Sequence, residues 1–154
     1  MPLLNVGDNA PDFQLQDHTG KTRTLGEFKG KRVLLWFYPK ADTPGCTKEG
    51  CGFRDRARDY SKLNVQILGA SFDNPKDNAA FVKKYDFTYP LLCDVNRTLG
   101  LAYGATTDPK ATYPERISYL IGGDGKIEKV WDKVDAKAHP ASVLAELGGA
   151  SAPM

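Results

Sequence analysis

The chain has 154 residues, of which 41% are hydrophobic and 26% are charged, and its formal net charge is +2. This length suits one domain spanning residues 1–154, and the composition is that of a soluble globular protein. The near-neutral charge gives no reason to expect a nucleic-acid partner. No apolar run approaches the roughly 20 residues that cross a membrane, and the N-terminus lacks a secretory pattern.

Three cysteines are present, and two of them, Cys46 and Cys51, lie close together. An odd number with this spacing is a poor framework for a secreted, disulfide-stapled scaffold. It fits redox chemistry in a reducing compartment, so we expect a cytoplasmic location.

The first third of the chain predicts a β-hairpin followed by a buried strand. Alternating residues in 13–16 and 22–24 flank an Asp/Gly turn, which is typical of a hairpin. A short helical turn is expected over residues 25–28. Residues 32–38 form a continuous apolar and aromatic run, which predicts a strand buried on both faces.

A helix is predicted to follow this strand, from Pro44 to about Leu63. Proline is favoured at a first helical position, and Thr43 or Asp42 can cap the helix start.

The rest of the chain continues this alternation and then changes to a hairpin. The expected elements are a strand at 65–71, a helix at 75–85, a short strand at 90–92, a short helix at 95–103, strands at 116–121 and 126–131, a helix at 140–147 and a flexible tail at 148–154. Parallel β-α-β units followed by a Gly-rich hairpin imply an α/β protein with a mixed central β-sheet flanked by helices. A hairpin after two β-α units is also the layout of a thioredoxin-like fold, which here follows an N-terminal β-hairpin.

Cys46 falls in the first turn of the helix that begins at Pro44. Unpaired backbone N–H groups and the positive end of the helix dipole favour a negative sulfur there. The thiolate is the reactive form of cysteine, so Cys46 is the candidate nucleophile.

Cys51 lies five positions after Cys46 and is the candidate second thiol. On an ideal helix the two Cα atoms would be roughly 8–9 Å apart, beyond the usual disulfide limit of about 6.8 Å. A disulfide between them therefore requires the first turns of the helix to unwind. Gly50 and Gly52 flank Cys51, and each weakens a helix by about 1 kcal/mol relative to alanine, which would ease that unwinding.

The chain resembles peroxiredoxins of the bacterioferritin comigratory protein, or peroxiredoxin Q, group. Pro39, Thr43 and Cys46 match the Pro-x-x-x-Thr-x-x-Cys motif of peroxiredoxins, and residues 46–55 resemble that group's helix with its second cysteine. Residues 7–13 resemble the family's N-terminal start, and residues 116–121 followed by 124–127 resemble the strand that carries the family arginine.

This resemblance implies a thiol-specific peroxidase that acts on hydrogen peroxide and organic hydroperoxides. It implies that Cys46 attacks the peroxide and becomes a sulfenic acid, and that Cys51 resolves it to an intramolecular disulfide. Thr43 would hydrogen-bond the thiolate and the peroxide, Arg116 would stabilise the developing charge, and Pro39 would shield the pocket. Thioredoxin or a similar dithiol would reduce the disulfide, and no metal, haem or flavin is needed.

A purely structural role stays open for three of these residues. Thr43 can be only a helix cap, Arg116 only an exposed strand residue in an ion pair, and Pro39 only the end of a strand. Cys93 is interpreted as a buried bystander, with a role as an alternative resolving thiol only if the fold brings it near Cys46.

The other candidates are assigned no chemistry. Glu49 and Arg54 are interpreted as solvated helix residues, His18 and His139 as surface residues, and Trp36 and Trp131 as packing residues.

Two other functions compete with the peroxidase. A thiol-disulfide reductase typically carries Cys-x-x-Cys at a helix start, a spacing that this chain lacks. A redox sensor or holdase could use the same thiols. A zinc site is disfavoured because only one further cysteine and two distant histidines remain as ligands. The group is often monomeric, and a weak dimer stays open.

Overall fold

The protein is described here from a computed structural model that defines residues 3–148. In chain order the elements are β1 (Gln14–Gln16), β2 (Thr22–Thr24), the 3₁₀ helix η1 (Leu25–Phe28), β3 (Arg32–Phe37), α1 (Pro44–Asp55), α2 (Ala57–Lys62), β4 (Val65–Ser71), α3 (Pro75–Tyr85), β5 (Leu91–Cys93), α4 (Thr98–Ala102), β6 (Ser118–Ile121), β7 (Ile127–Trp131) and α5 (His139–Glu146).

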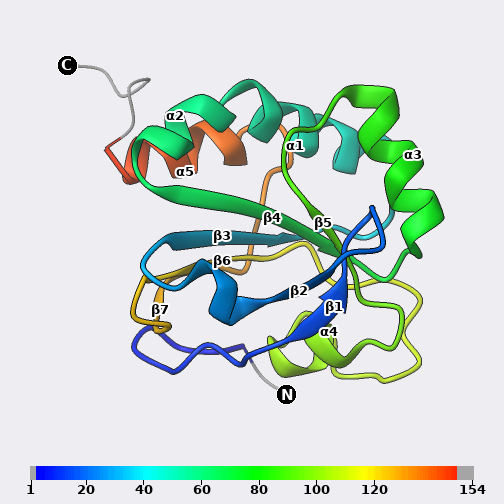
Figure 1. Cartoon of the computed structure of the whole chain (residues 1–154), viewed down its shortest axis with the longest axis horizontal. Helices are drawn as coiled ribbons and strands as arrows, with labels where there is room; N and C mark the ends of the chain where they lie inside the picture. Colours follow the sequence, from blue (N-terminus) through cyan, green and yellow to red (C-terminus); the bar gives the residue numbers. More distant parts are fainter. Residues whose placement is uncertain (1–2, 149–154) are drawn as a thin grey trace.

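Five strands form one mixed sheet in the order β5-β4-β3-β6-β7 (Figure 1). Strands β3, β4 and β5 run parallel, and the β6–β7 hairpin joins β3 in the antiparallel direction. The separate β1–β2 hairpin completes the N-terminal part. The expected α/β architecture, with a mixed sheet and an N-terminal β-hairpin, is therefore confirmed.

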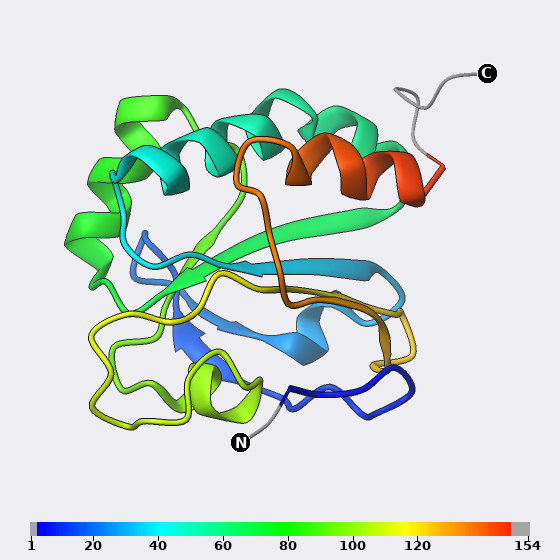
Figure 2. The same ribbon diagram turned by 180° about the vertical axis from the view of Figure 1, so that it is seen from behind.

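Two helical layers cover the sheet. Helices α1, α2, α3 and α5 lie on one side, and η1, α4 and the β1–β2 hairpin lie on the other (Figures 1 and 2). Side chains of β3 alternate between two apolar clusters: Trp36 packs with Phe53 of α1, and Phe37 packs with Leu99 of α4. A strand whose side chains enter both clusters must be apolar on both faces. This explains the continuous run of apolar residues at this place in the sequence.

The helix expected over residues 44–63 is divided in the structure. Arg56, with ψ of 6°, lies outside the α-helical region and separates α1 from α2. Its guanidinium donates to the carbonyl of Gly52, which fixes the bend. The change of direction allows the Tyr60 hydroxyl of α2 to donate to the carbonyl of Pro140, at the start of α5.

Two other expected elements are shorter than the sequence pattern indicated. The strand expected from residue 116 begins at Ser118, which leaves Arg116 in the segment before it, and the helix expected over 95–103 occupies only Thr98–Ala102. The tail expected at 148–154 lies outside the described residues except for Gly148. Within residues 3–148, no helix is long and apolar enough to span a bilayer.

Candidate active site

Cys46 is the third residue of α1, directly beyond the carboxyl end of β3. Pro44 opens the helix, as the sequence predicts, and Thr43 has the extended backbone of an N-cap residue. The Thr43 side chain does not cap the helix; its hydroxyl donates to the carbonyl of Lys40 at 2.7 Å. Cys46 itself has no exposed surface, and its sulfur lies in the first turn of the helix, near the positive end of the helix dipole.

The sheet register brings Arg116 to this helix start. Trp36 of β3 pairs with Ser118 of β6, and the Phe37 amide bonds to the carbonyl of Ile117. The next residue back along the chain, Arg116, therefore lies where β3 ends and α1 begins. Its Nη2 donates to Cys46 Sγ at 3.5 Å.

Gly45 makes room for this contact. A Cβ atom at Gly45 would lie 2.9 Å from Arg116 Nη2, closer than real side chains approach. The glycine before Cys46 therefore allows the guanidinium to reach the sulfur.

Glu49 is part of the same cluster, and the expectation that it is solvated is wrong. Its side chain is fully buried, and its Oε1 accepts a hydrogen bond from Arg116 Nη1 at 2.7 Å. Its second oxygen, Oε2, has no hydrogen-bond partner among the described residues. Burial raises the pKa of Glu49 to about 7, although Arg116 pulls it in the opposite direction.

A sequence signal for Glu49 existed. Residues three apart on a helix lie on the same face, so a carboxylate at position 49 must share the face of Cys46. The burial of that face could not be read from the chain. For Arg116, burial opposes the charge, yet the hydrogen bond to Glu49 and the proximity of Cys46 raise its pKa overall.

Cys51 lies on the same continuous helix as Cys46, and both thiols are free. Cys51 is half-buried, and this burial raises its pKa. Because α1 is unbroken from Pro44 to Asp55, the separation expected for an ideal helix applies, and the two sulfurs do not face each other.

The glycines beside Cys51 have a packing role in addition to any effect on helix propensity. A Cβ at Gly50 would lie 2.5 Å from the Phe87 ring, and one at Gly52 would lie 2.7 Å from Pro140. The Gly50 carbonyl also accepts a hydrogen bond from the Tyr89 hydroxyl at 2.7 Å. The second half of α1 is therefore held closely against the protein.

Pro39 lines a concavity of about 280 Å³ beside the site loop. Phe72, Val95 and Tyr113 contribute its apolar surface, and Val95 and Tyr113 are 44% and 51% exposed. Polar and charged side chains, among them Lys40 and Asp73, complete the lining, and a hollow of mixed character is typical of a contact surface for a ligand.

The remaining cysteine and one histidine are buried. Cys93 is buried as expected, its Sγ accepts from Asn78 at 3.3 Å, and burial raises its pKa to about 11. The expectation that His139 lies at the surface is wrong: it is buried, and its Nε2 lies 3.0 Å from the Ser118 hydroxyl. Burial lowers the pKa of His139 to about 4. His18 is half-buried, and its Nδ1 accepts from the Leu91 amide.

Arg54 of α1, expected to be solvated, makes an ion pair and a hydrogen bond within the protein. Its guanidinium pairs with Asp55 at 2.9 Å and donates to the carbonyl of Tyr85 at 2.7 Å. Trp36 has no exposed surface, as expected for a packing residue. Trp131 is only partly buried, and its indole donates to Glu146.

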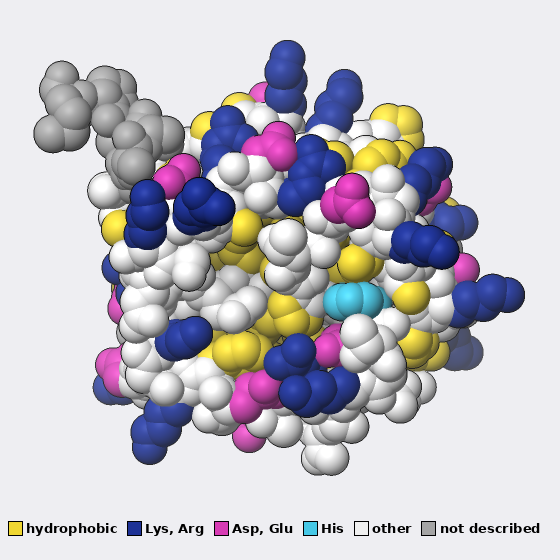
Figure 3. Space-filling view, turned by 45° about the horizontal axis from the view of Figure 1, so that its top comes forward, with side chains coloured by type: hydrophobic (Ala, Val, Ile, Leu, Met, Phe, Trp, Pro, Cys, Tyr) yellow, Lys and Arg dark blue, Asp and Glu magenta, His cyan; other side chains and the backbone are white. Residues whose placement is uncertain are grey.

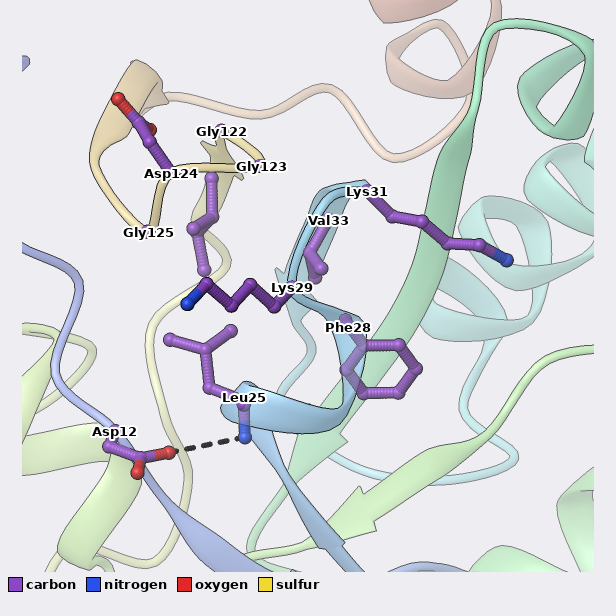
Figure 4. A pocket seen from close by; sticks show the side chains of 12 residues that line it. Asp12, Leu25, Phe28, Lys29, Lys31, Val33, Gly122, Gly123, Asp124 and Gly125 are labelled. Carbon is purple, nitrogen blue, oxygen red and sulfur yellow. Dashed lines mark hydrogen bonds between the residues drawn. The ribbon is translucent and has the colours of Figure 1, made fainter.

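Other hollows lie away from Cys46. One, of about 200 Å³, is at the opposite end of β3, between η1 and the Gly122–Gly125 turn (Figure 4). Another is lined by His18, Gln66 and Thr88. Figure 3 shows a face on which basic and acidic side chains are mixed around hydrophobic ones and a histidine. None of the site residues expected from the sequence lines either hollow.

Known proteins resemble this chain over nearly its whole length. The family model described as the AhpC/TSA family matches residues 6–130. A putative peroxiredoxin bcp of Coxiella burnetii is 42% identical over 149 residues, which cover 94% of this chain and 99% of the relative. The crystal structure of peroxidoxin BcpB from Mycobacterium tuberculosis has a TM-score of 0.87 at 34% identity, covering 94% and 97% of the two chains. A Xanthomonas campestris bacterioferritin comigratory protein, studied for alkyl peroxide reduction, has a TM-score of 0.83 at 30% identity, covering 88% and 90%.

Proposed function

This chain belongs to the AhpC/TSA family and is a thiol peroxidase of the Bcp and peroxiredoxin Q type, and we propose that Cys46 is its nucleophile and Cys51 its resolving thiol. The resemblance noted in the sequence and the thioredoxin-like fold are thereby confirmed. The roles of individual residues belong to the proposal.

The contact between Arg116 and Cys46 carries the assignment. Only one of the three thiols has a guanidinium at 3.5 Å within the described residues, and that thiol also lies at a helix N-terminus. Both effects favour a thiolate. The Cys46 thiolate attacks one peroxide oxygen, the O–O bond breaks, and the sulfur becomes a sulfenic acid while the other oxygen leaves as water or an alcohol after gaining a proton. Arg116 stabilises the negative charge on the leaving oxygen.

Cys51 completes the cycle. Its thiol attacks the Cys46 sulfenic sulfur, an S–S bond forms, and the sulfenic oxygen leaves as water. This step requires the first turns of α1 to unwind, because the helix holds the two Cα atoms beyond the disulfide range of about 6.8 Å. An external dithiol, most simply thioredoxin, then reduces the disulfide.

Thr43 and Pro39 shape the approach to the sulfur. The Thr43 hydroxyl starts from a hydrogen bond with Lys40 and turns toward the peroxide when a substrate enters. The hollow next to Pro39 has a mixed lining, and its apolar part, formed by Phe72, Val95 and Tyr113, accepts the organic part of a hydroperoxide, so the substrates include both hydrogen peroxide and organic hydroperoxides. The proposed enzyme is a single-domain, cytoplasmic, thioredoxin-dependent peroxidase, monomeric or at most weakly dimeric, that works without metal, haem or flavin.

One experiment separates this function from a disulfide reductase or a redox sensor. Reduced protein is mixed with one equivalent of hydrogen peroxide, and thiol loss and tryptic peptides are followed. A Cys46–Cys51 disulfide should form on the order of a hundredfold faster than a free thiol reacts. Cys51→Ser should hold a sulfenic acid at Cys46 and stop turnover with thioredoxin, while Cys93→Ser turns over like the wild type. Insulin reduction without peroxide consumption would instead identify a reductase.

A further inference from the structure

Glu49 lies between the two thiols in the chain, within the segment that must unwind to join them. It is fully buried, its only side-chain hydrogen bond among the described residues runs to Arg116, and its Oε2 has none. A buried carboxylate with an unpaired oxygen is unfavourable, because the loss of hydration exceeds what a single ion pair returns. The free energy of the Glu49 carboxylate therefore falls when unwinding of the helix exposes it to water.

The two halves of α1 are held differently. From Gly50 onward the helix is anchored: the Tyr89 hydroxyl bonds to the Gly50 carbonyl, Pro140 packs on Gly52, and Arg54 donates to the carbonyl of Tyr85. The segment 44–49 makes two side-chain hydrogen bonds, from Cys46 and Glu49, and both go to the Arg116 guanidinium; Cys46 also packs in the apolar cluster of Trp36. The side chain of Arg116 is 22% exposed and can exchange these partners for water.

We infer that Glu49 is a positioning residue for the resolving step: release of its buried carboxylate into water drives residues 44–49 to unwind and carries Cys46 toward an anchored Cys51. In this role Glu49 keeps Arg116 at the sulfur while the helix is intact and lowers the barrier to opening it. The inference rests on the proposed role of Cys51. Release of the Glu49 carboxylate makes resolution faster and so leaves less time for a second peroxide to oxidise the sulfenic acid to a sulfinic acid.

The titration of Glu49 supports this direction. Burial raises its pKa to about 7, so the ionised form is less favourable inside the helix than in water, and unwinding of the ionised protein is favoured by that difference. The titratable groups near Glu49 are Arg116 from the segment before β6, Cys46 on α1 and Tyr89 from the segment before β5. Helix α5 contributes His139, which is held by Ser118 and packs on Phe53.

The test is the resolution rate of Glu49→Gln, which keeps the shape of the side chain but has no charge to release. Sulfenic acid formation is measured separately in a Cys51→Ser background, and disulfide formation is followed by rapid quench and mass spectrometry. At pH 8 the variant should resolve at least tenfold more slowly than the wild type and collect more sulfinic acid per turnover. The ratio of the two rates should fall as the pH drops from 8 through 7, and it should approach one only near pH 4.5, where the wild-type carboxyl is neutral in both the helical and the unwound state. Using the ratio removes the titration of Cys51, which both proteins share.

Two further variants keep the outcome decisive. Glu49→Asp retains a buried carboxylate on the same helix face, one methylene closer to the backbone, and should resolve within about threefold of the wild type, even if Glu49→Gln folds poorly. Asp59→Asn removes a carboxylate from the neighbouring helix α2 and should leave both steps within about twofold. Equal resolution by wild type and Glu49→Gln at pH 8, or a ratio that does not change with pH, overturns the inference alone. Failure of the wild type to form a Cys46–Cys51 disulfide overturns the proposed function instead.

Discussion

Arg116 Nη2 lies 3.5 Å from Cys46 Sγ although 70 residues separate them in the chain. The same guanidinium holds Glu49 through its other terminal nitrogen at 2.7 Å. One planar side chain thus serves a thiol and a carboxylate on one helix face, a task for which arginine has the right donor geometry and lysine does not.

Arg116→Lys should therefore slow the oxidation of Cys46 by hydrogen peroxide by about tenfold to a hundredfold. The ammonium keeps the charge but cannot donate to both partners in fixed directions. Second-order rates of thiol loss measure this effect. Arg58→Lys, on the exposed side of α2, is the matched control and should oxidise at the wild-type rate. An Arg116→Lys rate equal to that of the wild type would mean that the contact has no part in the reaction.

Gly50→Ala should destabilise the protein by about 1–3 kcal/mol although alanine is the better helix former. The added Cβ would lie 2.5 Å from the Phe87 ring. Urea unfolding of both single variants and of Gly50→Ala/Phe87→Leu measures the coupling, and the double variant should recover part of the loss. A more stable Gly50→Ala protein would show instead that the glycine serves only to make the helix easy to unwind.

Tyr113→Ser should lower kcat/KM for cumene hydroperoxide by about fivefold and leave kcat/KM for hydrogen peroxide unchanged. The reason is the loss of apolar surface from the hollow beside Pro39, at roughly 25 cal/mol per Å² of contact. Hydrogen peroxide, which has no organic part, is the internal control. If both substrates lose the same factor, the hollow does not bind the organic group.

The two buried side chains Glu49 and His139 should make the free energy of unfolding depend on pH in opposite directions. Glu49 has its folded-state pKa raised to about 7, so the stability it contributes is fully present below about 4.5 and is lost as the pH rises through 7. His139 has its folded-state pKa lowered to about 4, so its contribution is present above about 6.5 and is lost as the pH falls through 4. Each effect is on the order of 3 kcal/mol, and in the wild type they oppose each other over overlapping ranges.

Single substitutions should separate the contribution of each side chain to the pH dependence of stability. Relative to the wild type, Glu49→Gln should gain stability as the pH rises from 4.5 to 7, whereas His139→Gln should gain stability, relative to the wild type, as the pH falls from 6.5 to 4. Urea unfolding at a series of pH values measures both differences, and the comparison with the wild type cancels the carboxylates that all three proteins share. Differences that stay constant across pH 4–8 would show that neither group is desolvated in the folded protein.

Much of the fold and part of the site could be predicted from local patterns. The apolar run before Pro39, the proline and threonine at the helix start and the Gly-rich turn at 122–125 each act over a few residues, so the sequence alone predicts β3, the start of α1 and the β6–β7 hairpin. The division of the long helix at Arg56 was not predictable, because it depends on side-chain contacts made once α2 packs on α5.

The sequence by itself determined that Cys46 lies in the first turn of a helix and that Cys51 cannot reach it while that helix is intact, since both follow from helix geometry and a proline. Only the tertiary structure decided that Glu49 and His139 are buried and that Gly50 faces Phe87. The register between β3 and β6 decided that Arg116 meets Cys46. Burial and register are set by residues far apart in the chain, and their consequences for charge appear only when distant segments exclude water from the same place.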